Sequence, residues 1–218
     1  MSDITGYNRL VAFDQIKRTI FAIDRTIVSY YDANKDFWDE LYLKWASPKA
    51  VEFSNKYQPI IYNELLDFFK MERAFIIDAV DACRKIAEAN GDTSFSVNNF
   101  PLIDIALESK HIGGDFPTFR EDFFGTVGMN VMKVKEIIAK YIADTSEAVV
   151  SLSDIPFDIA LFDPDNAMAN AYKNQIEKMK EKMEATITMI KSDISKAMGE
   201  EENTILIAKD SATEALNG

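Results

Sequence analysis

Two residue types are almost missing from this sequence of 218 residues, since Cys83 is the only cysteine and His111 the only histidine. An internal disulfide is therefore excluded, and Cys83, which falls on an apolar helix face, is expected to be a buried and unreactive thiol. With one residue of each kind, the sequence gives no argument for a Cys-His or Ser-His-Asp arrangement, although paired carboxylates on helices stay open. The sequence predicts no catalytic residues and no cofactor, and it favours a protein that is not an enzyme.

Glycine and proline are also scarce, at eight and six residues, and they gather largely in the expected turns and linker. No stretch is apolar enough to span a bilayer, and the N-terminus lacks the basic and apolar regions of a cleaved secretory signal. The net charge of −12 argues against nucleic acid, because phosphate binding needs clustered lysine and arginine. We therefore predict an almost wholly helical, acidic protein, made in the cytoplasm, with no membrane insertion and no nucleic-acid partner.

Apolar residues at alternating spacings of three and four mark the first helix. The series is Phe13, Ile16, Ile20, Ile23, Ile27, Tyr30, Phe37 and Leu41. Only Asn34, which stands at the position between Tyr30 and Phe37, interrupts it. This pattern is typical of a helix that lies along a partner, and a helix over about 8–43 would be roughly 50 Å long.

A second helix is expected directly afterwards. Ser47 stands where an N-cap belongs and Pro48 at the first helical position, where its missing N–H is not needed. Pro59 predicts a kink or a delayed start, and Asn90-Gly91 is a plausible end. The apolar face, which is broken at Glu72, comprises Ile61, Leu65, Phe68, Phe75, Ala79, Ala82 and Ile86.

The same plan occurs a second time. One apolar seam runs from Phe124 to Leu152 and another from Tyr172 to Ala197, and between them Asp163-Pro164 repeats the cap and proline of the first turn. We interpret this as a degenerate internal duplication of hairpin, linker and hairpin. The alternative is that any long helical hairpin can use a capped proline turn.

These patterns predict an all-α fold in which two long antiparallel helical hairpins pack as an elongated four-helix bundle. The first hairpin occupies 1–90 with its turn at 44–48, and the second occupies 121–198 with its turn at 153–164. Residues 91–120 form a linker with a short helix, and 199–218 form a tail that is either a short helix or mobile.

One spacing is compatible with a metal. Glu108-Ser109-Lys110-His111 has the Glu-x-x-His form found in di-iron bundles, which use two such pairs. The second pair cannot exist, because His111 is the only histidine, and the motif falls in the linker. We expect a solvated surface cluster there and no metal site.

The first turn carries a resemblance to a known family. The run Phe37-Trp38-x-x-Leu41-x-x-x-Trp45-x-Ser47-x-x-Ala50-x-x-Phe53 resembles the turn of the WXG family of small type VII secretion proteins, in which a Trp-x-Gly turn joins two helices. Ser47 stands in place of the glycine. The resemblance covers about residues 8–90, and the second hairpin resembles the family only in architecture, with Leu161 or Phe162 in place of the tryptophan.

Members of that family are about half this long and pair as four-helix dimers, so the resemblance implies a tandem chain that builds such a unit within itself. It implies a non-enzymatic protein that is secreted without a cleaved signal peptide, or a targeting partner or chaperone for a larger effector. Its partners would be a type VII secretion motor, an effector or a homologous hairpin protein, and the chain would be a monomer or homodimer. The family's export signal is a tyrosine four residues before an acidic residue. No tyrosine in this sequence has Asp or Glu at that distance, and Tyr141 has Asp144 three residues later.

Partner-binding residues are expected at the first turn, where a hairpin is most free to present an aromatic side chain. They are Trp38, Leu43, Trp45, Ser47 and Phe53. The competing interpretation is that Trp45 is a hydrophobic lid on the hairpin.

Two other classes stay open. A phage or virion assembly protein would also use long acidic hairpins, and it predicts open-ended oligomers where the secretion hypothesis predicts closed stoichiometry. An enzyme or metal carrier predicts stoichiometric bound metal.

Overall fold

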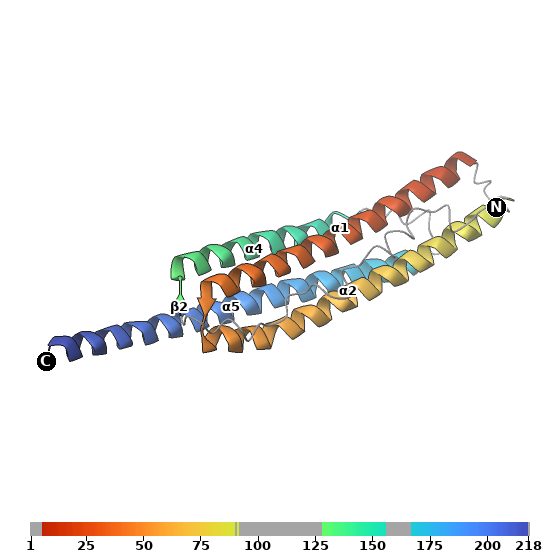
Figure 1. The fold of residues 1–218 in the computed structure, drawn as a ribbon. Coiled ribbons are helices and arrows are strands. Elements are labelled where there is room, and N and C mark those ends of the chain that lie inside the picture. Colours follow the sequence, from red (N-terminus) through yellow and green to blue (C-terminus); the bar gives the residue numbers. More distant parts are fainter. Residues whose placement is uncertain (1–5, 90, 92–127, 156–166, 218) are drawn as a thin grey trace.

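The computed structural model describes residues 6–89, 91, 128–155 and 167–217. The described helices are α1 (Gly6–Lys44), α2 (Pro48–Ala89), α4 (Val131–Ser153) and α5 (Ala167–Asn217). Two strands of two residues each accompany them, β1 (Trp45–Ala46) and β2 (Gly128–Met129). The predicted all-α class is confirmed, because the helices pack lengthwise into an elongated bundle (Figure 1).

Each of these four helices packs against two of the others. α1 contacts α2 and α4, and α5 contacts the same two helices from the other side. The most extensive of these contacts joins α1 to α4, which are far apart in the sequence but side by side in Figure 1. The core therefore lies along the common axis of all four helices.

The predicted seams line this core. In α1 every seam position from Ile16 to Leu41 is buried, Asn34 included, while the side chain of Phe13 lies outside the described part. Most seam positions of the other three helices are likewise buried: those from Ile61 to Ala79 in α2, from Val134 to Leu152 in α4 and from Tyr172 to Ile194 in α5. Burial of these apolar faces is the main force that holds the bundle together.

The first turn forms as its residues predict. α1 ends at Lys44 and α2 begins at Pro48. Ser47 is the N-cap, since its Oγ accepts a hydrogen bond from the Ala50 N–H at 3.2 Å and its carbonyl accepts one from the Val51 N–H at 3.1 Å.

The turn is also joined to the start of α4. β1 and β2 pair in antiparallel register, with Trp45 opposite Met129 and Ala46 opposite Gly128. The Asn130 N–H then donates to the Lys44 carbonyl at 2.9 Å. A helix that includes residue 128, as the spacing from Phe124 predicts, is wrong. Gly128 and Met129 are paired with β1, and Asn130 caps α4 by accepting from the Lys133 N–H at 3.1 Å.

Of the two effects expected of Pro59, a kink or a delayed start, the delayed start does not occur, because α2 begins at Pro48 as its cap predicts and continues through Pro59. α2 ends at Ala89, and Gly91 follows with a φ of +73°, a conformation that glycine adopts without strain. α5 continues through Gly199 to Asn217, so its last turns project beyond the bundle (Figure 1).

Several predicted features lie outside the described residues. They are the linker over 92–120, with Glu108 and His111, the Asp163-Pro164 cap, and the side chain of Cys83. None of the described helices is both long and apolar enough to cross a membrane.

Candidate functional site

The aromatic residues expected to bind a partner at the turn are packed inside the bundle. Trp38, Phe53 and Ser47 are buried, and Trp45 is only 1% exposed. The ring of Phe53 lies 5.7 Å from that of Trp38 and 6.4 Å from that of Trp45 between centroids. This placement favours the interpretation of Trp45 as a lid on the hairpin, because a buried ring in an aromatic cluster stabilises the fold.

Both indoles carry an unusual feature. The Nε1 atoms of Trp38 and Trp45 are buried and have no hydrogen-bond partner. A buried N–H donor usually finds an acceptor. Because neither indole N–H has one here, the two rings contribute to stability through apolar packing.

Leu43 is the exception among the five expected partner-binding residues. It lies in the last turn of α1 and is 63% exposed. Of the five, Leu43 is therefore the residue that a partner could contact in this conformation, and its role in binding stays a prediction.

Substitution of Ser47 tests the turn by itself. We expect Ser47→Ala to lower the free energy of unfolding by about 1 kcal/mol, because the Ala50 N–H would lose its acceptor. Ser47→Gly, which introduces the residue that the WXG turns carry at this place, should cost only a few tenths of a kcal/mol. Urea denaturation of both variants measures the difference, and an equal loss in both would mean that capping is not what Ser47 does.

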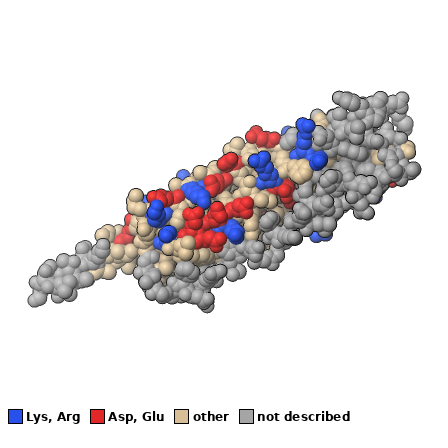
Figure 2. Space-filling model, turned by 45° about the horizontal axis from the view of Figure 1, so that its top comes forward, with Lys and Arg blue, Asp and Glu red and all other residues tan. Residues whose placement is uncertain are grey.

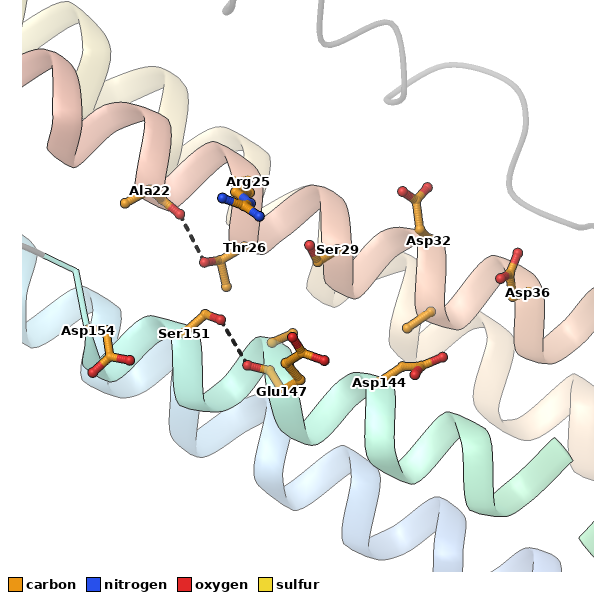
Figure 3. Close-up of a pocket in the computed structure, with 12 residues that line it drawn as sticks. Ala22, Arg25, Thr26, Ser29, Asp32, Asp36, Asp144, Glu147, Ser151 and Asp154 are labelled. Carbon is orange, nitrogen blue, oxygen red and sulfur yellow. Dashed lines mark hydrogen bonds between the residues drawn. The ribbon is translucent and has the colours of Figure 1, made fainter. Parts of the chain in front are cut away.

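A groove of about 610 Å³ runs between α1 and α4 and carries a strongly acidic lining. Figure 2 shows acidic side chains gathered at the middle of this face of the bundle. Figure 3 shows that the labelled side chains come from both helices, which face each other across the groove. The charged lining residues are Arg25, Asp32, Asp36, Asp144, Glu147 and Asp154.

Five carboxylates against one guanidinium give this groove a negative field, which is partly reduced where Lys140 contacts Asp36 at 3.4 Å and Glu40 at 2.9 Å. Such a field attracts cations and repels anionic partners. Within the described residues, no three His, Cys, Asp or Glu side chains are grouped so that they could hold a metal ion.

A polar cluster that the sequence analysis did not single out lies in the centre of the bundle. The buried carboxylate of Glu64 on α2 accepts from the Tyr30 hydroxyl of α1 at 2.9 Å and from the Thr186 hydroxyl of α5 at 2.7 Å. Burial raises the pKa of Glu64, while these two hydrogen bonds and the charge of Lys182 oppose the rise.

The cluster continues to the fourth described helix. Asn34 donates to the Tyr30 carbonyl at 2.7 Å, and its Oδ1 accepts from the Tyr141 hydroxyl of α4 at 3.1 Å. Burial raises the pKa of Tyr30 and of Tyr141, so both hydroxyls stay protonated as donors. Five side chains from four helices thus form one connected network, here called the central polar layer: Tyr30, Asn34, Glu64, Tyr141 and Thr186.

The central polar layer fixes how the helices align. Because each buried polar group is matched to specific partners on other turns or helices, sliding any helix by a turn would leave donors or acceptors unpaired in the core. The interruption of the first seam at Asn34 was the one signal in the sequence that pointed to this layer. No residue spacing revealed that Glu64 would join it.

These features define a helical-bundle protein with a capped aromatic turn, an acidic groove and a polar layer across its core. Comparison of the chain with protein-family models, curated proteins and solved structures gave no match.

Proposed function

We propose that this protein is a non-enzymatic helical protein of the type VII secretion kind, exported as a substrate or acting as a targeting partner or chaperone for a larger effector. Its partners would be the secretion motor, an effector or a homologous hairpin protein. The observation that carries the proposal is the turn at Trp45-Ala46-Ser47, which joins two long helices and caps the second of them.

The arrangement of the helices supports the proposal further. α4 and α5 complete a bundle around α1 and α2, as expected of a chain that builds a WXG-type four-helix unit by itself. A covalent link between two such halves would raise their effective concentration to roughly millimolar. The chain would then need no second subunit to fold.

The alternative is a phage or virion assembly protein, and one observation favours it. The end of α5 projects past the bundle, and Leu206 and Ile207 on this projection are largely exposed. A projecting apolar helix suits a part that joins neighbouring copies, and head-to-tail contacts of this kind generate open-ended assemblies.

Export from a bacterium with a type VII system tests the proposal. We expect a tagged chain to reach the culture medium when the motor ATPase is intact and to stay in the cell when it is deleted. Because the tyrosine-based signal is absent, export should require coexpression of a hairpin partner or effector. Equal amounts in the medium of both strains, with large open-ended oligomers in sedimentation, would support the assembly alternative instead.

Two exposed leucines make a matched pair of variants for this assay. Leu43→Ser should weaken partner binding about tenfold, the effect of losing a contact of about 1.4 kcal/mol, without lowering the melting temperature. Leu206→Ser, which removes a similarly exposed leucine from the α5 projection, should leave that binding unchanged. The reverse pattern, with oligomers lost in Leu206→Ser, would count against the secretion proposal.

A further inference from the structure

Glu72 of α2 is buried in a position that does not suit a charged carboxylate. It interrupts the apolar seam of α2, it is 4% exposed, and its Oε1 has no hydrogen-bond partner. Glu64, which lies two turns earlier on the same helix, is by contrast held by two hydroxyl donors. An ionised carboxylate in such surroundings is strongly disfavoured unless a donor or cation compensates it.

The group that Glu72 does contact is another acid. Its carboxyl lies close enough to that of Asp24, which α1 contributes from across the α1–α2 contact, for a hydrogen bond between the two. Two carboxylates cannot form a hydrogen bond without a proton, because an ionised carboxylate only accepts. The pair can therefore form that bond only while it holds a proton.

No described cation of α1 or α2 is among the groups that act on the Glu72 carboxyl. On α1, Lys17 lies over the ring of Phe21 at 5.7 Å, and Arg25 lines the groove shared with α4. On α2, Arg73 is exposed. Asp24 is the charged group that acts on the Glu72 carboxyl.

The α5 side of the pair is apolar. α2 contacts α5 at Asp67, which pairs with Lys182 at 3.7 Å, and again at Phe75, whose ring lies 4.4 Å from that of Tyr172. Between these two contacts the buried residues of α5 are Ile176 and Met179.

The charged side chains of α5 and of the end of α4 near the Asp24–Glu72 pair are either hydrogen-bonded to another residue or exposed to solvent. Lys180 of α5 donates to Ser153 at the end of α4 at 2.9 Å, and Lys173, Glu177, Lys178 and Glu181 are exposed. Asp154, which follows α4, is exposed as well. Burial first, and then the charge and hydrogen bond of Asp24, raise the pKa of Glu72 from 4.5 to about 8.

We propose that Asp24 and Glu72 form a proton-sharing latch between α1 and α2, which holds the two helices together while it keeps its proton and loosens their contact when the proton is lost. The direction follows from linkage. A carboxyl that binds its proton more tightly in the folded state stabilises that state most below its unfolded pKa, and this contribution is lost as pH rises through the folded pKa. The latch is therefore closed at acidic pH and opens from neutral pH toward about pH 8 and above.

The pH dependence of unfolding tests the latch. We expect the denaturation midpoint of the wild-type protein to fall between pH 5 and pH 9. Glu72→Gln should reduce that fall, leaving the part that the raised pKa of Glu64 contributes, and should exceed the wild type in stability at pH 9. The glutamine amide is neutral and can donate to Asp24 permanently. Glu88→Gln on the exposed face of α2 is the matched control and should follow the wild type. Parallel profiles for Glu72→Gln and the wild type would overturn the proposal.

Asp24→Asn separates a carboxyl pair from a merely buried acid. Removing the second charge should move the fall to lower pH without abolishing it, because burial of Glu72 remains. A profile unchanged by Asp24→Asn would contradict proton sharing.

The wild-type protein supplies an independent readout should a variant not fold. In a carbon-13 NMR titration of the side-chain carboxyls, the Glu72 signal should move near pH 8, and movement near pH 4.5 would overturn the latch. Hydrogen exchange, corrected for its intrinsic pH dependence, should show weaker protection of α1 and α2 amides around the pair at pH 9 than at pH 6. Equal protection at both pH values would show that losing the proton does not loosen the contact.

Discussion

Trp45→Ala should lower the free energy of unfolding by about 3–5 kcal/mol, which is a large part of the stability of a typical domain. The ring is 1% exposed and packs beside Phe53 where α1, β1 and α2 meet. Truncation would remove buried apolar area and leave a cavity at the turn, because the β1–β2 pairing holds the backbone in place. Urea denaturation monitored by circular dichroism gives the difference directly.

Two matched variants separate packing from recognition at this turn. Trp45→Phe should lose clearly less stability than Trp45→Ala, since it keeps an aromatic ring and the indole Nε1 makes no hydrogen bond. Leu43→Ala, at an exposed position of the same turn, should stay within about 0.5 kcal/mol of the wild type. If Trp45→Ala melted like the wild type but failed to bind a partner, the lid interpretation would be wrong.

Tyr30→Phe should cost about 1.5–3 kcal/mol, although it removes a single oxygen atom. That hydroxyl donates at 2.9 Å to the buried carboxylate of Glu64, which would keep only Thr186 as a donor. The loss should raise the pKa of Glu64 further, because the Tyr30 hydrogen bond lowers it. Stability would then fall more steeply with rising pH than in the wild type, since a raised folded-state pKa means stability lost as the proton leaves.

A double-mutant cycle with Glu64→Gln checks the cause. If the hydroxyl acts through the Glu64 charge, Tyr30→Phe should cost much less in the Glu64→Gln background than in the wild type. Additive effects of the two substitutions would show that the central polar layer is not energetically coupled.

The helices and the first turn could be predicted from the sequence because they depend on local rules. The alternating spacing from Ile16 to Leu41 reflects a buried helix face, and Ser47-Pro48 satisfies the start of the next helix through side-chain and backbone chemistry within three residues. The short β1–β2 pairing could not be predicted in this way, since Trp45 and Met129 are brought together only by the fold.

The role of the buried polar residues was also beyond the sequence alone. Asn34 and Glu72 were visible as interruptions of apolar seams, but the partner of each, Tyr141 for one and Asp24 for the other, lies on a different helix. Glu64 gave no signal, because a glutamate at a helix position is usually solvated and only the packing of α5 shows that it is covered. The three aromatic partner-binding candidates, Trp38, Trp45 and Phe53, met the same limit, because aromatic residues at a turn are equally compatible with exposure and with the burial observed.

Sedimentation equilibrium of the purified full-length chain, with circular dichroism on the same sample, tests the central claim that one chain closes the four-helix unit by itself. We predict a highly helical species with the mass of a single chain, or of a homodimer of bundles that stay folded on dilution to monomers. A chain that is unfolded without a partner, or an obligate dimer that loses its helices when diluted, would contradict the claim.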